Sequence, residues 1–361
     1  MEKLFLSALS KQEMIGDSPL GALYDFPGMG ILPGGKDVYV GEVKEGKKEG
    51  FGLWILNDQT VYAGFFKEGV FSGQGKILLR NGESWEGRFD EGKLQGEGRH
   101  ILADGAVVSG VFEDHVLMGK AEVVFPSGNL YEGDFSGDAM QGEGKMTYMD
   151  GSVYEGQWEK GKRQGQGTLT LPDGSVYKGS FEDDNAEDYG VMSYSDGKVY
   201  KGIWYRGKRH GKGIMTYTDG SSYEGFFRED IRSGYGTMHF SDGAVYSGSW
   251  SEDKMNGIGK MTTAEGLNYE GKWEDGKLAG DPVLKFANGD IYQGKSLNGL
   301  PEGKGRMQYA SGEVYEGEFV RGLRQGRGIL IRADGTRYMT RWENDMPLSF
   351  AGKDKNEKKA E

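Results

Sequence analysis

Apolar and polar residues alternate along most of the chain, and glycines interrupt the alternation at regular points. Residues 153–158 read Val-Tyr-Glu-Gly-Gln-Trp, and residues 165–171 read Gly-Gln-Gly-Thr-Leu-Thr-Leu. A period of two places successive side chains on opposite faces of a strand, so each run predicts a β-strand with one packed face. Dipeptides such as Asp173-Gly174 stand between the runs and are typical of hairpin turns. We therefore expect β-hairpins that are joined by six-residue connections such as residues 159–164.

The whole pattern repeats every 23 residues, with the tyrosine of Tyr-Glu-Gly as its anchor. Twelve of fourteen anchor positions are tyrosine, thirteen have glycine two residues later, and twelve have Phe or Trp four residues later. A glycine leaves room for an aromatic ring from a neighbouring strand, and cross-strand aromatic pairs contribute roughly 0.5–1 kcal/mol each. The sequence thus predicts an all-β fold, an elongated single-layer antiparallel sheet of about fourteen to fifteen stacked hairpin repeats that twists into a rod.

The repeats divide the chain into four predicted regions. These are residues 1–25, a cap with a short helix or disordered; 26–38, a degenerate half-repeat; 39–342, the repeat array; and 343–361, a charged disordered tail. In the repeat opened by Val108, His115 and Ala121 replace two glycines. Farther along, Pro282 replaces a glycine and Ser296 replaces an aromatic residue. Because proline cannot donate a hydrogen bond to a strand ladder, we expect a bend or weak joint near residues 280–300.

The 23-residue unit resembles the MORN repeat (membrane occupation and recognition nexus), which residues 154–179 match almost letter for letter. The resemblance covers residues 39 to about 342. Because the segments outside the array are too short for a catalytic domain, the chain is most similar to the stand-alone MORN scaffolds of the protist cytoskeleton. The resemblance implies a non-enzymatic structural scaffold of a membrane-apposed cytoskeletal assembly. The alternatives are a module that binds phospholipid head groups, and a structural component of a cilium or radial spoke.

Composition narrows the function classes further. Lys and Arg number 44 against 56 Asp and Glu, giving a net charge of −12, and cysteine is absent. The acidic balance argues against a nucleic-acid-binding protein, and without cysteine there are no disulfides, thiolate metal sites or thiol catalysis. We expect a cytoplasmic protein associated with the cytoskeleton, peripheral to a membrane or in a cilium or basal structure, with no cofactor and no metal.

Three patterns that suggest catalysis are accounted for by the repeat. Residues 289–296 fit a phosphate-loop pattern, but the register of the repeat dictates both of their glycines. Glutamates that follow the anchors alternate with the aromatic residues, so we expect them on a solvated face; they are Glu86, Glu132, Glu155, Glu224, Glu270 and Glu316. The four histidines have no partner at motif spacing, and surface or turn positions are expected for them; they are His100, His115, His210 and His239. An enzyme is therefore disfavoured.

Three sets of residues are candidates for interaction. Basic residues of the connections would contact lipid or other anions: Lys44, Lys47, Lys48, Lys160, Lys162, Arg163, Arg206, Lys208 and Arg209. The aromatic rows would either be buried by the twist, which is favoured, or form a partner groove: Tyr131, Tyr154, Trp158, Tyr200, Trp204, Tyr223, Trp250 and Trp273. An open sheet edge invites pairing, so we expect a homodimer through the C-terminal repeats, around Tyr315, Phe319, Tyr338 and Trp342.

The elongated architecture is tested by small-angle X-ray scattering. Strands about 4.8 Å apart, two per repeat, give a rod of about 130 Å before twist shortens it, and hence a monomer radius of gyration of about 35–40 Å. A compact domain of this length would have a radius near ~21 Å. A measured value close to that of the compact domain would contradict the architecture.

Overall fold

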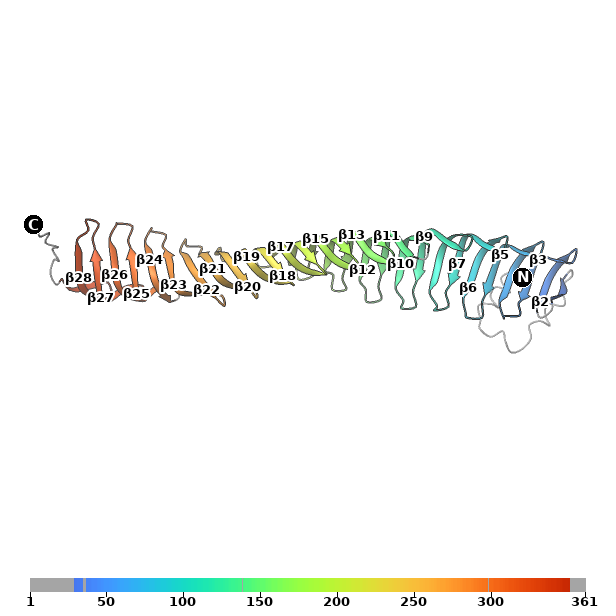
Figure 1. Ribbon diagram of the computed structural model, residues 1–361, viewed down its shortest axis with the longest axis horizontal. Helices are drawn as coiled ribbons and strands as arrows, with labels where there is room; N and C mark the ends of the chain where they lie inside the picture. The colour runs from blue at the N-terminus through green and yellow to red at the C-terminus, as the bar shows by residue number, and fades with distance from the viewer. Residues whose placement is uncertain (1–28, 35–36, 138, 298, 351–361) are drawn as a thin grey trace, which may run out of the picture. The chain divides into compact units, whose positions relative to one another are not determined.

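The computed structural model describes residues 29–34, 37–137, 139–297 and 299–350. Within these ranges the regular structure consists of β-strands, drawn as arrows in Figure 1. No helix in the same ranges is long and apolar enough to cross a membrane. The chain divides into two compact units, residues 1–185 and 186–361, which we describe separately as unit 1 and unit 2.

Unit 1 contains β1 (Met29–Gly34), β2 (Asp37–Lys44), β3 (Lys47–Ile55), β4 (Val61–Lys67), β5 (Val70–Leu78), β6 (Ser84–Asp90), β7 (Lys93–Ile101), β8 (Val107–Glu113), β9 (Val116–Val124), β10 (Leu130–Ser136), β11 (Ala139–Thr147), β12 (Val153–Glu159), β13 (Lys162–Thr170) and β14 (Val176–Glu182).

Unit 2 contains β15 (Asn185–Ser193, whose first residue is the last of unit 1), β16 (Val199–Tyr205), β17 (Lys208–Thr216), β18 (Ser222–Arg228), β19 (Ile231–His239), β20 (Val245–Ser251), β21 (Lys254–Thr262), β22 (Asn268–Glu274), β23 (Lys277–Lys285), β24 (Ile291–Leu297), β25 (Leu300–Gln308), β26 (Val314–Val320), β27 (Leu323–Ile331), β28 (Arg337–Glu343) and β29 (Met346–Phe350).

Within each unit, every strand pairs antiparallel with the strands before and after it in the chain. In unit 1 this order runs from β1 to β14. In unit 2 it runs from β15 to β29. The predicted all-β fold of stacked antiparallel hairpins is confirmed.

The connections predicted to span six residues are in fact two-residue hairpin turns. Between β12 and β13 only Lys160 and Gly161 lie outside the strands, with φ angles of 51° and 81°. Positive φ at both central residues defines the type I′ turn, whose twist matches that of the flanking strands. The prediction was wrong here because the charged residues that flank the turn, such as Lys162 and Gln164, continue the ladder as part of β13.

The predicted Asp-Gly turns form the second kind of hairpin connection. After β13, the Gly174 amide donates to the Leu171 carbonyl at 2.9 Å, and the Leu171 amide donates to the Ser175 carbonyl at 2.8 Å. Gly174 has a φ of 87°, which closes the turn at little cost because glycine has no Cβ. The Asp173 carboxylate accepts a hydrogen bond from the Ser175 amide at 2.8 Å and holds the loop. Hairpin turns therefore alternate between the two types along the array.

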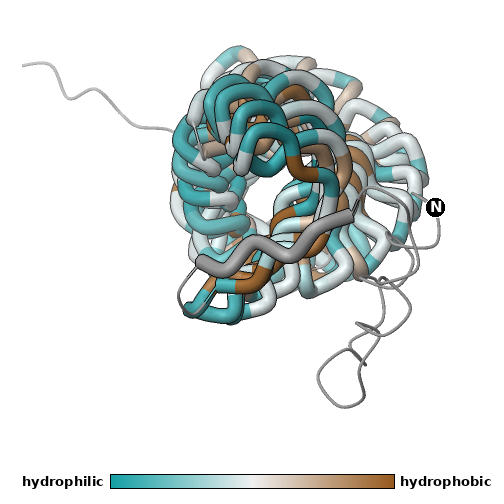
Figure 2. Tube along the Cα trace, turned by 90° about the vertical axis from the view of Figure 1, so that its right-hand side faces the viewer, coloured by the Kyte–Doolittle hydropathy of each residue, from teal (hydrophilic) through white to brown (hydrophobic). Residues whose placement is uncertain are grey.

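The anchor tyrosines form the centre of the packed face. Tyr154 is fully buried, and its ring covers Gly156 on its own strand and Gly167 on the next strand, which are directly opposite each other. A Cβ added to Gly167 would stand 2.5 Å from the Tyr154 ring. Buried and exposed positions alternate along β12, and hydrophobic and hydrophilic residues are intermixed along the chain in Figure 2. Glycine is required at both positions because the ring takes the space of a side chain.

A strand irregularity gives each buried tyrosine hydroxyl its hydrogen-bond partner. The register between β12 and β13 shifts between Gly156 and Trp158, and the Tyr154 hydroxyl donates to the Gln157 carbonyl at 2.9 Å. The same bond to the carbonyl three residues later is made at 2.7–3.3 Å by Tyr39, Tyr62, Tyr131, Tyr177, Tyr200, Tyr223, Tyr246, Tyr292 and Tyr315. The phenol is thus buried without an unsatisfied polar group.

Aromatic residues four positions after the anchor connect one repeat to the next. The Tyr154 ring meets Trp158 of its own repeat edge-on at 5.2 Å and Phe181 of the next repeat at 4.9 Å. Edge-to-face contacts of this kind contribute about 0.5–1.5 kcal/mol beyond area burial. The indole nitrogen of Trp158 also donates to the Gly144 carbonyl of the previous repeat at 3.2 Å. Each repeat is therefore stabilised by both of its neighbours.

The departures from the repeat have the predicted local effect in unit 2. Strands β23 and β24 share three ladder positions, against six between β21 and β22. Pro282 lies beside this gap, and the Tyr269 hydroxyl is directed at Gly299 instead of its own strand. Tyr269 is only partly buried, unlike the other unit 2 anchors Tyr200 and Tyr223. The expectation of a weak joint near residues 280–300 is confirmed in the pairing.

The ends of the array differ from the predicted boundaries. Strand β29 (Met346–Phe350) pairs with β28, so regular structure continues past Trp342 into the segment that was predicted to be a disordered tail. At the other end, β1 pairs with β2 over six positions of the predicted half-repeat. The predicted N-terminal cap at residues 1–25, residues 26–28 and the tail at residues 351–361 lie outside the described residues.

A matched pair of glycine substitutions tests the packing of tyrosine on glycine. In Gly259→Ala the new Cβ would meet the Tyr246 hydroxyl at 2.2 Å, whereas in Gly271→Ala, directly opposite, the nearest atom is 3.2 Å away. We expect Gly259→Ala to lower the free energy of unfolding by about 1–3 kcal/mol and Gly271→Ala by less than about 1 kcal/mol. Urea denaturation followed by circular dichroism measures both, and equal losses would contradict the packing argument.

Candidate interaction surfaces

The aromatic residues predicted to line a partner groove form the core of the two units. All eight side chains, from Tyr131 to Trp273, are at most 5% exposed. Desolvation raises the pKa of the phenols, to about 12 for Tyr223, because the charged form is disfavoured away from water. Of the two alternatives that the sequence left open, burial within the sheet is the one observed. The rings of these eight aromatic residues are not accessible to a partner, because neighbouring repeats already cover them.

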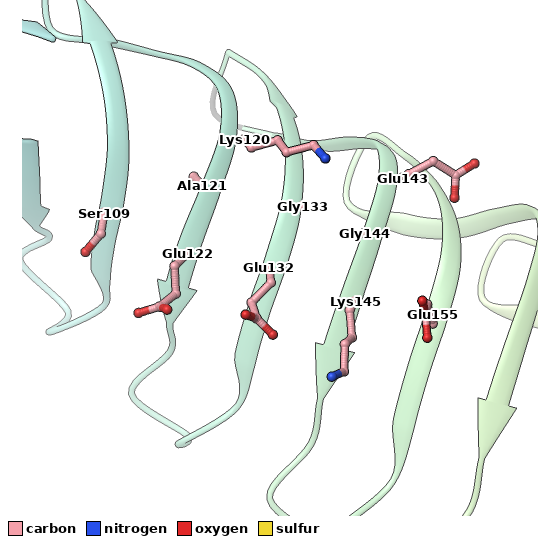
Figure 3. A pocket seen from close by; sticks show the side chains of 10 residues that line it. All are labelled: Ser109, Lys120, Ala121, Glu122, Glu132, Gly133, Glu143, Gly144, Lys145 and Glu155. Carbon is pink, nitrogen blue, oxygen red and sulfur yellow. The ribbon is translucent and has the colours of Figure 1, made fainter. Parts of the chain in front are cut away.

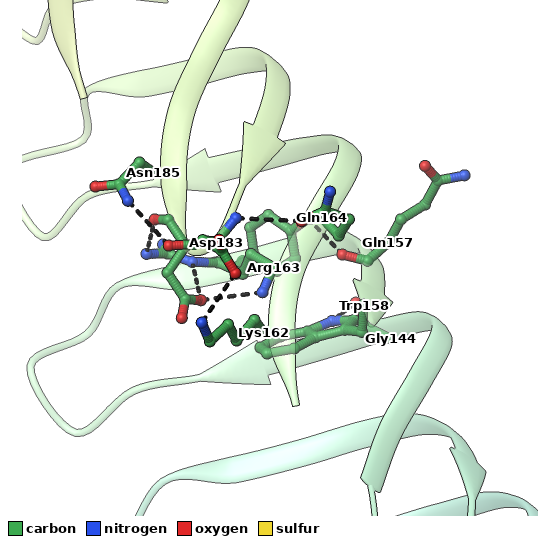
Figure 4. Close-up of polar contacts among 10 residues, drawn as sticks. Gly144, Gln157, Trp158, Lys162, Arg163, Gln164, Asp183 and Asn185 are labelled. Atoms are coloured by element: carbon green, nitrogen blue, oxygen red, sulfur yellow. Dashed lines mark hydrogen bonds and ion pairs between the residues drawn. The ribbon is translucent and has the colours of Figure 1, made fainter. Parts of the chain in front are cut away.

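Several of the predicted anion contacts are instead ion-paired with the next repeat. Lys162, at the start of β13, contacts Asp183 at 2.9 Å (Figure 4). Lys208, at the start of β17, contacts Glu229 at 3.4 Å. The two partners are 21 residues apart. The lysine is the first residue in the second strand of one hairpin, and this position faces the type I′ turn of the following hairpin. Asp183 raises the pKa of Lys162 through this hydrogen bond. The charge is largely compensated within the protein.

Four arginines make a more extensive contact of the same kind, which we call the arginine clasp. Arg163 donates from its backbone amide and from Nε to the Asp184 carboxylate, at 3.0 and 3.2 Å, and from Nη2 to the Asp184 carbonyl at 2.6 Å. The other clasps are Arg209–Asp230, Arg232–Asp253 and Arg324–Asp345. The clasps use Arg163 and Arg209, two of the predicted anion contacts.

Each clasp arginine also covers the aromatic core. The Arg232 guanidinium lies 4.5 Å from the Trp250 ring centroid and 5.5 Å from that of Tyr223. Met255 occupies the corresponding position in the following repeat, and there the residue 21 positions later is Gly276 instead of aspartate. The aspartates of the clasps occupy the second turn position at positive φ, 64° for Asp253. The arginine therefore combines the packing role of an apolar side chain with a hydrogen-bonded ion pair.

The remaining basic candidates are held less tightly. The Lys48 ammonium lies 3.1 Å from the Trp54 ring centroid, and desolvation lowers its pKa. Lys160 contacts its chain neighbour Glu159 at 3.3 Å. Lys44, Lys47 and Arg206 are exposed at or beside the turns. The structure thus places the nine residues in different environments and does not gather them into one basic site.

Side chains of the predicted dimer region are mostly internal. Tyr315 and Phe319 are buried, Trp342 is 4% exposed, and Tyr338 is partly buried. The Trp342 indole nitrogen is buried without a hydrogen-bond acceptor among the described residues, whereas Trp273 donates to a glycine carbonyl fourteen residues earlier. Outer positions of the same strands carry exposed apolar groups, including Met339 and Met346.

Two histidines have partners that sequence spacing did not reveal. His100 stacks on Trp85 at 3.4 Å between ring centroids, and its Nε2 lies 2.9 Å from Glu83. The hydrogen bond with His100 lowers the pKa of Glu83. His115 takes the glycine position of a type I′ turn, meets Trp85 edge-on at 5.0 Å, and has its pKa lowered by desolvation. No group of three or more His, Asp or Glu side chains in the described part of the chain is placed to hold a metal ion.

The predicted solvated glutamates face away from the core, as expected. Glu132 and Glu155 belong to a shallow groove of about 510 Å³ over β8 to β12, where side chains from neighbouring strands lie in parallel rows (Figure 3). The lining includes four carboxylates and the ammonium groups of Lys120 and Lys145. Directly opposite positions on adjacent strands bring Glu132 next to Lys145. The opposed charges are typical of a solvated polar face.

Comparison with known families identifies the repeat. The MORN repeat model matches residues 39–107 and 131–337 in consecutive units of about 23 residues, with residue 268 left unmatched. This chain belongs to the MORN repeat family. The unmatched stretch 108–130 is the repeat in which valine replaces the anchor tyrosine and His115 and Ala121 replace two glycines. The MORN repeat is a structural repeat, and this membership supplies no catalytic assignment.

Searches for individual relatives add little to the family assignment. No curated protein matches the chain. The TCP10 domain of Danio rerio CPAP, solved with a STIL peptide, is 15% identical over 71% of this chain and 97% of that chain, with a TM-score of 0.31. The Drosophila melanogaster SAS-4 TCP domain, solved with a proline-rich motif of Ana2, is 16% identical over 49% and 85%, with a TM-score of 0.23. Staphylococcus aureus virginiamycin B lyase is 10% identical over 82% and 95%, with a TM-score of 0.13. At these TM-scores the likenesses support no inference about this chain.

A double-mutant cycle tests the arginine clasp. Arg232→Met alone leaves Asp253 unpaired in its turn, and Asp253→Gly alone leaves the guanidinium over the rings without its carboxylate. The double variant recreates the Met–Gly pair of the next repeat, so we expect it to recover most of the lost stability, with a coupling energy of about 1 kcal/mol. Urea denaturation of the four proteins measures it. Strictly additive effects would show that the clasp contributes no stability.

Proposed function

We propose that this MORN protein is a non-enzymatic structural scaffold that organises a membrane-apposed cytoskeletal assembly by self-association and partner binding, like the stand-alone MORN arrays of protists. The observation that supports this proposal is that many polar and charged side chains are already bonded to other residues of the array. The Tyr154 phenol is hydrogen-bonded within its own strand, the Trp158 indole donates to the previous repeat, and the Arg163 guanidinium pairs with the next repeat. Residues that are internally committed in this way stabilise a rigid surface for other proteins and have no free group for chemistry.

Self-association through the C-terminal repeats is part of this proposal. Strand β29 pairs with β28 along one edge, and β28 is the one strand with which it pairs among the described residues. A strand with an open edge carries unpaired backbone N–H and C=O groups that a second copy can satisfy. Exposed Met346 and Leu348 on β29 support this location for a homodimer.

Binding of phospholipid head groups is the second candidate, and the structure favours it less. A row of free Lys and Arg side chains attracts anionic lipid at roughly 1 kcal/mol per contact. Here Lys162, Arg163, Lys208 and Arg209 already have carboxylate partners in the following repeat. A membrane would have to compete with these ion pairs. A structural role in a cilium is compatible with the same scaffold properties.

Detergent fractionation tests the scaffold proposal. A tagged full-length copy, expressed in the cells from which the chain comes, is expected to stay with the insoluble cytoskeleton after extraction with non-ionic detergent. The matched control is the same chain carrying Lys162→Gln and Lys208→Gln, which removes two exposed lysine charges and leaves the packed face unchanged. Retention of both proteins supports the scaffold. Complete release of the unaltered chain would contradict it. Membrane association before extraction that both detergent and the two lysine substitutions abolish would favour lipid binding.

A further inference from the structure

An apolar patch lies on the outer face of unit 2, the face opposite to the aromatic core. Its six side chains come from β15 to β21, and we call them the outer patch: Tyr189, Ile203, Ile214, Phe226, Tyr235 and Ile258. Tyr189, Tyr235 and Ile258 are 56%, 61% and 69% exposed. Tyr189 stands directly opposite Ile203 on the neighbouring strand. None of these residues belongs to the packed face or to the predicted interaction sets.

The outer patch differs from the polar outer positions of most other repeats, although unit 1 carries an apolar pair at the same register, Phe51 and Phe65. At the register positions of Ile203 and Phe226, the flanking repeats carry Gln157, Ser180 and Lys272, and within the patch Ser249 of β20 stands opposite Tyr235. At the position of Tyr189, Tyr235 and Ile258, other repeats carry polar residues, as in Gln166, Asp281, Lys304 and Arg327. Since the packed face is the same in all these repeats, the fold does not require the apolar residues. A cluster of exposed apolar side chains that the fold does not require can mark an interaction site.

Bare glycines hold two of the patch side chains in place. A Cβ added to Gly211 would meet the Ile203 Cβ at 3.4 Å, and one added to Gly234 would meet the Phe226 Cβ at the same distance. Ile203 and Phe226 therefore rest on the backbone of the neighbouring strand. A side chain that is fixed before binding loses little conformational entropy when a partner covers it.

Three lysines give the outer patch its charge. Lys201 stands opposite Ile214, Lys212 stands opposite Phe226 with its ammonium 5.6 Å from the ring centroid, and Lys260 extends the same row. Unlike the lysines of the turns, these three make no ion pair with a carboxylate among the described residues. Glu224, opposite Ile214, lies between them, and Glu270, which is ion-paired with Lys285, stands opposite Lys260. The surface is therefore apolar and locally cationic on a chain whose net charge is −12.

The strands below the patch limit the conformation of what binds there. Strands β16 to β21 are paired along both edges, so their backbone groups are already used in the ladders. An extended peptide lying on this face would find no backbone hydrogen bonds, whereas a helix satisfies its own. The patch crosses seven strands, and the six spacings of about 4.8 Å between them span about 29 Å, which corresponds to roughly 19 residues of helix.

We propose that the outer patch is a docking surface for an acidic amphipathic helix of a partner protein, whose apolar stripe covers the six side chains and whose carboxylates meet Lys201, Lys212 and Lys260. The proposal rests on the scaffold function and names the chemistry of one partner. A second copy of the chain would bring the same lysines against one another at a two-fold contact. A flat membrane would also meet the Glu224 carboxylate, which lies between the lysines.

Peptide binding to the purified full-length chain tests the proposal by fluorescence anisotropy. The probes are two labelled amphipathic helices with the same Leu and Phe stripe, one with Glu and one with Lys on its polar face. We expect the Glu peptide to bind about tenfold more tightly at low salt. The triple variant Phe226→Ser, Tyr235→Gln, Ile258→Gln, which uses residues found at these positions in other repeats, is expected to weaken its binding about tenfold or more.

Two further variants separate specific docking from general stickiness. Lys201→Gln, Lys212→Gln, Lys260→Gln should remove the preference for the Glu peptide and the salt dependence. The matched control Phe51→Gln, Phe65→Ser alters an apolar pair at the same register in unit 1 and should leave binding unchanged. Circular dichroism and urea denaturation check that each variant is folded. Detergent fractionation of the same patch variant tests the scaffold role separately, since self-association at the C-terminal repeats does not involve the patch.

Several outcomes would overturn the proposal. These are equal binding of the two peptides, unchanged binding by the patch variant, or an equal loss of binding in the Phe51, Phe65 control. If sedimentation shows that the patch variant loses self-association, a second copy covers the patch. If the chain binds phosphatidylcholine–phosphatidylserine vesicles through the patch but does not distinguish the peptides, the surface is a membrane contact. Either result would replace the helix as the occupant.

Discussion

The rest of the structure depends on a tyrosine ring that lies over two glycines of adjacent strands. The ring fills the space of two missing side chains, and the strand irregularity beside it exposes a carbonyl that accepts the phenol hydrogen. Burying the phenol is favourable only if both conditions hold, because an unpaired buried hydroxyl is costly. The two glycines and the irregularity must therefore recur together with the tyrosine, which explains why the 23-residue spacing is kept without insertion or deletion.

The repeats are joined by contacts that each hairpin cannot make alone. An isolated hairpin is marginally stable, and here the aromatic residue of one repeat packs on the tyrosine of the previous one. The turns add a second connection, in which Gln164 accepts a hydrogen bond from the Asp183 amide of the following turn at 3.1 Å. Arginine clasps provide the same link where aspartate replaces the turn glycine. Nearest-neighbour stabilisation of this kind is the general property of repeat proteins.

The packing of tyrosine on glycine constrains the residues of the packed face only. Residues of the outer face are free to vary, so the function of that face can differ among repeats. The outer positions of β10 to β12 carry opposed charges such as Glu132 and Lys145, whereas those of β15 to β21 carry Tyr189, Phe226 and Ile258. These changes do not disturb the packed tyrosines, since the outer side chains point away from them. A MORN array can thus keep one architecture and present different chemistry along its surface.

Much of the fold followed from periodicity. Alternation at period two located the strands, Asp173-Gly174 located one kind of turn, and the loss of glycine at Pro282 predicted the weak pairing between β23 and β24. The second kind of turn was missed, because lysines and glutamines resemble loop residues by composition although they belong to strands. The feature that identifies this second kind of turn is the positive φ of Lys160 and Gly161, which is a property of the folded backbone.

The candidate surfaces were harder to predict for a physical reason. By itself the sequence determined which residues alternate, how often the unit recurs, and that aromatic residues and glycines share one face, because these are local and periodic properties. Only the tertiary structure decided that Arg163 pairs with Asp184, that Tyr154 and Trp158 are closed off from partners, and that Tyr235 and Ile258 stay exposed. Ion pairing and burial depend on which residues of neighbouring strands come opposite each other, and strand pairing sets those distances.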